Sequence, residues 1–201
     1  MTMKMIGFLD LPVVTPAAQA IFDDDIAEDG YVMNVSRLWA YNAGLVTGLF
    51  DLMRQAVSEH ALTFRHRSIL VAAFASTLGD SYCSLAWGSK LAAVSDPETA
   101  AGVILGGDES LNEEERALAS WARKVAGDPN ATTQEDVGVL HSAGFNDEQI
   151  FAITAFVALR LAFSTVNDAL GVGPDMALRT TAPEAVVNAV RYGRPPVDHP
   201  V

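Results

Sequence analysis

The amino-acid sequence predicts a single all-α domain. Apolar residues recur every three or four positions through most of the chain, which is the spacing of one helix face. Glycine and proline interrupt this pattern, and no alternation of apolar and polar residues bounded by hairpin turns is present. A chain of 201 residues can bury a sizeable core. We expect one domain over 1–201, with a core at 31–178, an N-terminal arm at 1–30 and a C-terminal helix and tail at 179–201.

The N-terminal arm contains a short expected helix from Ala17 to Phe22, which ends at the acidic run Asp23-Asp24-Asp25. We interpret this run as a solvated face. A metal site is the alternative, although three adjacent acids cannot share one helix face.

Four helices are expected in the rest of the first half, at 34–59, 65–78, 82–94 and from 96 to about 105. Thr63 is a suitable cap for the second helix, and Gly79 is its natural end. Ser95 is the expected cap of the fourth helix, and Gly106 its end.

The second half repeats this organisation, so we expect two similar halves. Asn112 and Glu115 have the spacing of a capping box at the start of a helix that ends near Gly127. Further helices are expected at 133–141, at 147–170 with Asn146 as its cap, and at 183–192.

Composition excludes several classes of function. The formal net charge of −12 disfavours binding to nucleic acid or to an anionic membrane. The apolar segment from Ile150 to Phe163 is broken by polar residues, so we expect a buried helix and no membrane span. A single cysteine excludes a CxxC motif and, without a signal peptide, favours the cytoplasm. No paired-histidine spacing is present, and we expect neither a metal nor another cofactor.

The turn after Gly79 carries the strongest candidate chemistry. Cys83, the only cysteine, lies in the first turn of the expected helix that follows. The positive end of a helix favours a thiolate, so we expect a lowered pKa for Cys83, although a carboxylate at Asp80 opposes this effect. Two alternatives remain: Cys83 packs as an inert apolar side chain, and Asp80 serves as the helix cap.

This corner resembles the core of the carboxymuconolactone decarboxylase and alkylhydroperoxidase (AhpD-like) superfamily, in particular its peroxidase-related branch. The family motif is Glu, eleven residues, Cys, two residues, Cys, three residues, His. Cys83 matches the second cysteine, whereas Asp80, Ser68 and Trp87 stand at the other three positions, so the motif is degenerate. The segments ERALASWARKVA, HSAGFNDEQI and VNDALGVGPD extend the resemblance over roughly 32–178.

The resemblance implies a bundle of antiparallel helix pairs that assembles as homo-trimers or hexamers and acts on a small-molecule substrate. Because the dithiol is lost, we expect acid–base chemistry in a helical pocket. Asp80 would then exchange a proton, Tyr82 would orient or donate, and Cys83 would complete the catalytic set. Ser68 and Trp87 are the expected substrate-binding residues, with core packing as the alternative for Trp87.

Two other functions stay open at this stage. The first is a one-cysteine hydroperoxide reductase, in which Cys83 is recycled by an external thiol. The second is a non-catalytic oligomer that binds a ligand or serves as a scaffold. Arg160 and Asp168 interrupt the apolar helix at 147–170. Such charges lie at an edge or a subunit contact, or else they bind a substrate carboxylate.

Overall fold

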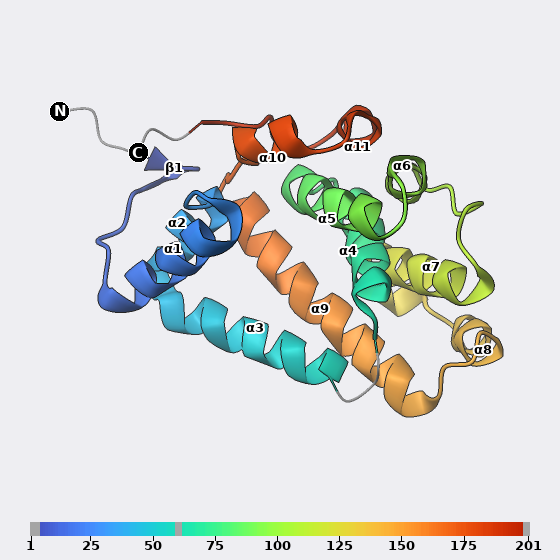
Figure 1. Ribbon diagram of the computed structural model, residues 1–201. Helices are drawn as coiled ribbons and strands as arrows, with labels where there is room; N and C mark the ends of the chain where they lie inside the picture. The colour runs from blue at the N-terminus through green and yellow to red at the C-terminus, as the bar shows by residue number, and fades with distance from the viewer. Residues whose placement is uncertain (1–4, 59–61, 199–201) are drawn as a thin grey trace.

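The computed structural model describes residues 5–58 and 62–198, and most of them are helical (Figure 1). The helices of this part of the chain are α1 (Pro16–Asp29), α2 (Asn34–Trp39), η1 (Ala40–Asn42), α3 (Ala43–Ser58), α4 (Phe64–Leu78), α5 (Ser81–Val94), α6 (Pro97–Leu105), α7 (Glu113–Gly127), η2 (Pro129–Ala131), α8 (Gln134–Ser142), α9 (Asp147–Ala169), α10 (Met176–Thr181) and α11 (Glu184–Ala189). The prediction of an all-α protein is therefore confirmed.

Helix α4 lies at the centre of the core. Its residues 69–75 are completely buried, because α5, α6, α7 and α9 pack around it. Gly79 ends α4 in the left-handed conformation with a φ of +77°, and the chain turns directly into α5. Helices α4 and α5 therefore form the expected hairpin, and α9 runs across the domain beside α3 (Figure 1).

Side-chain caps begin the helices where the sequence indicated. Thr63 caps α4, and capping boxes open α7 at Asn112 and α9 at Asn146. The expected cap at Ser95 is wrong. Asp96 caps α6 instead, because its carboxylate accepts hydrogen bonds from both the backbone N–H and the hydroxyl of Thr99.

The N-terminal region differs most from the expectation. A small hairpin, β1 (Met5–Ile6) with β2 (Leu9–Asp10), precedes α1. Helix α1 begins with a Thr15 cap and Pro16, and it continues through the acidic run instead of ending there.

The single helix expected at 34–59 is also wrong. A 3-10 turn, η1, divides it into α2 and α3. The expected end at Glu59 falls outside the described residues.

At the C-terminus, the helix expected at 183–192 is present but shorter, as α11, and the preceding helix α10 was not predicted. The chain forms α10 and α11, and α11 packs against α6 and α5. Beyond α11, the segment 190–198 returns over the start of α5, where the Ser81 hydroxyl donates to the Arg194 carbonyl at 2.8 Å. This strap holds the α4–α5 turn in place.

Helix α9 is long and apolar enough to cross a membrane by length and composition alone. It packs against α3, α4 and α7 within the domain, and nine of its residues are buried. Core helices of this kind satisfy the same criterion, so the observation does not indicate a membrane span.

Candidate functional site

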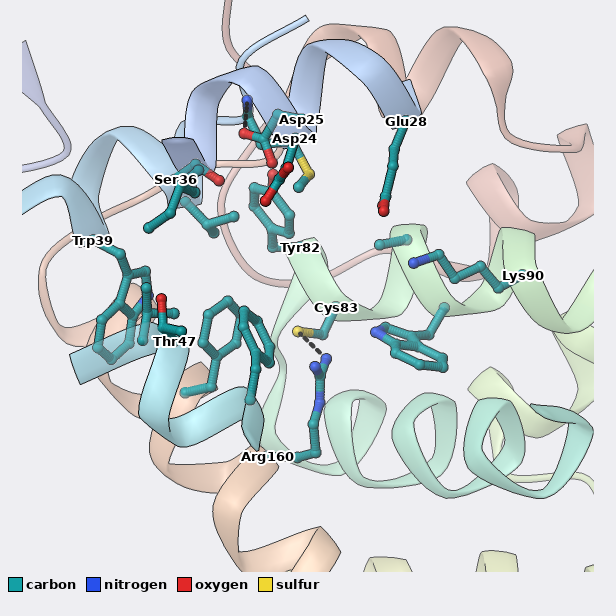
Figure 2. A pocket seen from close by; sticks show the side chains of 18 of the residues that line it. Asp24, Asp25, Glu28, Ser36, Trp39, Thr47, Tyr82, Cys83, Lys90 and Arg160 are labelled. Carbon is teal, nitrogen blue, oxygen red and sulfur yellow. Dashed lines mark hydrogen bonds between the residues drawn. The ribbon is translucent and has the colours of Figure 1, made fainter. Parts of the chain in front are cut away.

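A cavity of about 400 Å³ opens between α1, α2, α3, α5 and α9 (Figure 2). Its walls are largely apolar and include five aromatic side chains, Trp39, Phe50, Tyr82, Trp87 and Phe163. Trp39 and Phe163 stack nearly parallel with their ring centroids 5.5 Å apart. Such a space suits a small molecule with an aromatic or other apolar body.

Asp80 lies behind the cavity wall and is not among the residues that line it. It is completely buried, and its Oδ1 accepts the backbone N–H of Cys83 at 2.9 Å, so the N-cap interpretation is confirmed. Its Oδ2 has no hydrogen-bond partner within the described part of the chain. Burial, together with the charge of Asp80, raises the pKa of nearby Asp168 to about 7.

Cys83 is only 2% exposed, and it lines the cavity from the first turn of α5. Arg160 Nη2 donates to its Sγ at 3.6 Å, and the Ser164 hydroxyl does so at 3.5 Å. Burial raises the pKa of the Cys83 thiol, and the charge of Asp80 raises it further, whereas Arg160 and Ser164 lower it. The pKa lies well above its ordinary value, so the expected lowering at the helix end is wrong: burial outweighs the helix dipole.

Arg160 reaches this site from α9, 77 positions beyond Cys83 in the sequence. It is 5% exposed, so the interpretation that places it at an edge is wrong. Its guanidinium carbon lies 5.0 Å from the ring centroid of Trp87 and 5.3 Å from that of Phe163. Figure 2 shows its terminal nitrogens directed at the Cys83 sulfur. In the sequence, Arg160 stands out as a charged residue within an apolar helix, but this pattern does not indicate which side chain it contacts.

Tyr82 also lines the cavity, but its hydroxyl is already engaged. It donates to Asp175 Oδ2, while Asp175 Oδ1 accepts the backbone N–H of Asn34 at 2.9 Å. Burial raises the pKa of Tyr82 well above its ordinary value and that of Asp175 to about 6. Asp175 was not singled out from the sequence, because it meets Tyr82 only through the fold.

The two expected substrate-binding residues lie in different places. Trp87 lines the cavity, and Lys90 Nζ lies 4.8 Å from the centroid of its ring. Ser68 is completely buried outside the cavity, and its hydroxyl donates to the Phe64 carbonyl of its own helix at 2.8 Å. The structure therefore brings Tyr82, Cys83 and Trp87 together and leaves Ser68 apart.

Acidic residues of α1 form the opposite side of the cavity. Asp24, Asp25 and Glu28 all line it (Figure 2). Asp25 is buried and accepts the backbone N–H of Met33 at 2.9 Å, so the solvated-face interpretation is wrong for this residue. Burial raises the pKa of Asp25. Within 5–58 and 62–198, no group of three or more His, Cys, Asp or Glu side chains is arranged to hold a metal ion.

Neither the protein-family models nor the curated protein sequences give a match to this chain. Among solved structures, an uncharacterized peroxidase-related protein from Silicibacter sp. TM1040 matches with a TM-score of 0.74 and 23% identity, over 88% of this chain and 95% of that one. An AhpD-core peroxidase-related protein from Ralstonia eutropha JMP134 gives 0.74 and 20%, over 94% and 99%. The chain has the AhpD-like fold.

The debrominase Bmp8 has the same overall architecture. Its apo structure matches with a TM-score of 0.70 and 16% identity, over 88% of this chain and 92% of that one. A cysteine-to-alanine variant of Bmp8 in complex with 2,3,4-tribromopyrrole gives 0.71 and 16%, over 90% and 96%. At these identities the comparisons establish the fold.

Within this AhpD-like fold, the site can perform chemistry at one sulfur. The sequence holds a single cysteine, so an oxidised Cys83 has no second thiol in its own chain. The Arg160 guanidinium and the Ser164 hydroxyl can stabilise negative charge on Sγ, because both donate to it. The apolar walls can hold a substrate body against that sulfur.

Proposed function

We propose that this protein is a single-cysteine enzyme that reduces a small, largely apolar hydroperoxide at Cys83 and is recycled by an external thiol. The observation that supports the proposal is the environment of Sγ. The sulfur faces a cavity lined by aromatic side chains while Arg160 and Ser164 donate to it. Thiolate chemistry needs both an accessible reaction partner and donors for the negative charge.

In the first step, the Cys83 thiol loses its proton to solvent, and the thiolate attacks the terminal oxygen of the hydroperoxide. The O–O bond breaks, its electron pair leaves with the alkoxide, and the alkoxide takes a proton from water. Cys83 becomes a sulfenic acid. One external thiol then condenses with it and releases water, and a second external thiol releases Cys83 and an external disulfide.

Acid–base chemistry at Asp80 and Tyr82 has less support from the geometry. Asp80 lies outside the cavity lining with one oxygen committed to capping α5, and the Tyr82 hydroxyl is bonded to Asp175. Cys83 has neither restriction, because its sulfur borders the cavity and its contacts there are donors.

Reductive dehalogenation is the second candidate. The aromatic walls of the cavity and the likeness to Bmp8, a debrominase with a bromopyrrole complex, favour it. Here the thiolate takes the halogen, and the ring carbon keeps the electron pair and gains a proton. An external thiol then displaces halide from sulfur to give a mixed disulfide, and a second thiol restores Cys83. The overall reaction converts two thiols to a disulfide, hydrogen halide and the dehalogenated ring.

The test is to measure external thiol oxidation with cumene hydroperoxide and, separately, with tribromopyrrole. We expect turnover with at least one substrate, complete loss in Cys83→Ser, and a severalfold decrease in Ser164→Ala. The matched control is Ser76→Ala on α4, whose hydroxyl bonds only within its own helix and whose loss leaves the site intact. If neither substrate gives turnover above the Cys83→Ser background, the proposal is overturned.

A further inference from the structure

Arg160 carries a buried charge without an anionic partner. Within the described residues it forms no ion pair with a carboxylate, and its one hydrogen bond goes to the Cys83 sulfur. Its Nε is buried and has no partner. An unpaired buried charge is destabilising, because it has lost its hydration without a compensating charge. This arginine therefore favours any arrangement that brings an anion beside it.

Cys83 does not supply that anion in the resting protein. Burial and the charge of Asp80 hold the pKa of Cys83 well above its ordinary value, so the sulfur is a neutral thiol near pH 7. The carboxylates that line the cavity belong to α1, on the side opposite Arg160 (Figure 2). The space beside the guanidinium is therefore the part of the cavity that still lacks a negative group.

The surroundings of Arg160 indicate the shape of the missing anion. The rings of Trp87 and Phe163 lie within 5.0 and 5.3 Å of the guanidinium carbon, and Lys90 Nζ lies 4.8 Å from the Trp87 ring. Aromatic surfaces around a planar cation suit a flat ligand that stacks on the rings and presents its charge to the guanidinium. Lys90 also borders the cavity, and burial together with the charge of Arg160 lowers the pKa of its amino group.

We propose that Arg160 is an anion subsite, and that the leaving group displaced from the substrate when Cys83 attacks it is a small aromatic anion such as an arenecarboxylate. This inference rests on the proposed function and names its substrate class. For an aromatic peroxy acid, a bond forms between Sγ and the terminal peroxide oxygen, and the O–O bond breaks. Its electron pair leaves with the carboxylate, which Arg160 binds. The Cys83 thiolate, whose proton has gone to solvent, is oxidised to the sulfenic acid, and the peroxy acid is reduced to the carboxylate.

Binding of simple probes by isothermal titration calorimetry tests the subsite without any turnover. Benzoate is the aromatic anion, benzamide its neutral analogue, and acetate the anion without a ring. On the wild type at fixed ionic strength, we expect benzoate to bind at least tenfold more tightly than either of the other two. Arg160→Gln should weaken benzoate binding at least tenfold, whereas Arg160→Lys should retain part of it. Equal binding of benzoate and benzamide, or no benzoate binding, would overturn the inference.

The same titration on Cys83→Ser separates this inference from the proposed function. That variant has no thiol chemistry but keeps the cavity, so it should bind benzoate about as well as the wild type. If Arg160→Gln does not fold, as judged by circular dichroism, the three-probe comparison on the wild type and on Cys83→Ser decides. In the wild type, benzoate binding without any turnover would refute only the proposed function, and turnover without selectivity for benzoate would refute only the subsite.

Discussion

Asp80→Asn should make Cys83 more reactive. The asparagine side chain keeps an oxygen that can accept the Cys83 N–H, and asparagine is among the best N-caps. What the substitution removes is the negative charge, which is the second cause of the raised Cys83 pKa after burial. The pKa should therefore fall, although it should stay above the ordinary value of a cysteine because the sulfur remains buried.

The size of the effect follows from two opposing terms. A charge in contact range shifts a neighbouring pKa by about 1–3 units. Each unit raises the thiolate fraction about tenfold while the pH is below the pKa. Nucleophilicity falls with pKa with a Brønsted slope of about 0.4–0.5, so the net gain is roughly threefold per unit. For a fall of about 1–3 units, we expect alkylation to become about three- to thirtyfold faster.

The assay is the rate of alkylation by iodoacetamide, followed by intact mass at several pH values; the sequence has no other cysteine to react. Asp80→Ala is the matched control. It also removes the charge but loses the cap, so it should react faster as well and be less stable by about 1 kcal/mol. If Asp80→Asn folds and reacts no faster than the wild type, burial alone sets the Cys83 pKa, and the electrostatic reasoning fails.

Three further predictions concern stability. Burial raises the pKa of Asp175 to about 6, so the native state binds a proton at this carboxyl more tightly than the unfolded chain does. The protonated carboxyl therefore stabilises the fold at low pH, and this stability is lost as the pH rises from about 4 to 6. In urea unfolding, the free energy of unfolding of Asp175→Asn minus that of the wild type should therefore increase as the pH rises from 4.5 to 7. A difference that does not vary with pH would contradict this. Trp39→Phe should cost about 1–3 kcal/mol, because it leaves the buried Oδ1 of Asn167 without its 2.9 Å hydrogen bond; a thermal midpoint equal to that of the wild type argues against it. Gly193→Ala should lower the melting temperature more than Gly30→Ala, since both have a positive φ but only at Gly193 would the new Cβ meet a backbone carbonyl oxygen, at 2.6 Å; equal losses would show that this contact does not matter.

Local signals in the sequence were enough to predict where most of the helices begin and end. The caps at Thr63, Asn112 and Asn146 and the stop at Gly79 act through residues within one turn, and each is found in the structure. The start of α1 carried an equally local signal in Thr15 followed by proline. The helix was expected to begin one residue later, at Ala17, because proline disfavours helix in the residue before it. The expected end at Phe22 was wrong because the acidic run does not end the helix.

The candidate site was less predictable, because its parts come from distant segments. Cys83 meets Arg160 and Ser164 of α9, and Tyr82 meets Asp175 beyond it. No spacing rule links such positions. Burial of the thiol is also a property of the whole fold, which explains why an argument from the helix end alone gave the wrong direction for the pKa of Cys83.

A single turnover without reductant shows directly whether Cys83 reduces a hydroperoxide. The protein is mixed with one equivalent of cumene hydroperoxide, and intact mass is recorded over time. We expect the gain of one oxygen atom at Cys83 together with stoichiometric release of the alcohol, no reaction in Cys83→Ser, and return to the original mass after a small thiol is added. Consumption of the hydroperoxide at equal rates in the wild type and Cys83→Ser would contradict this expectation, and so would an unmodified Cys83 in folded protein.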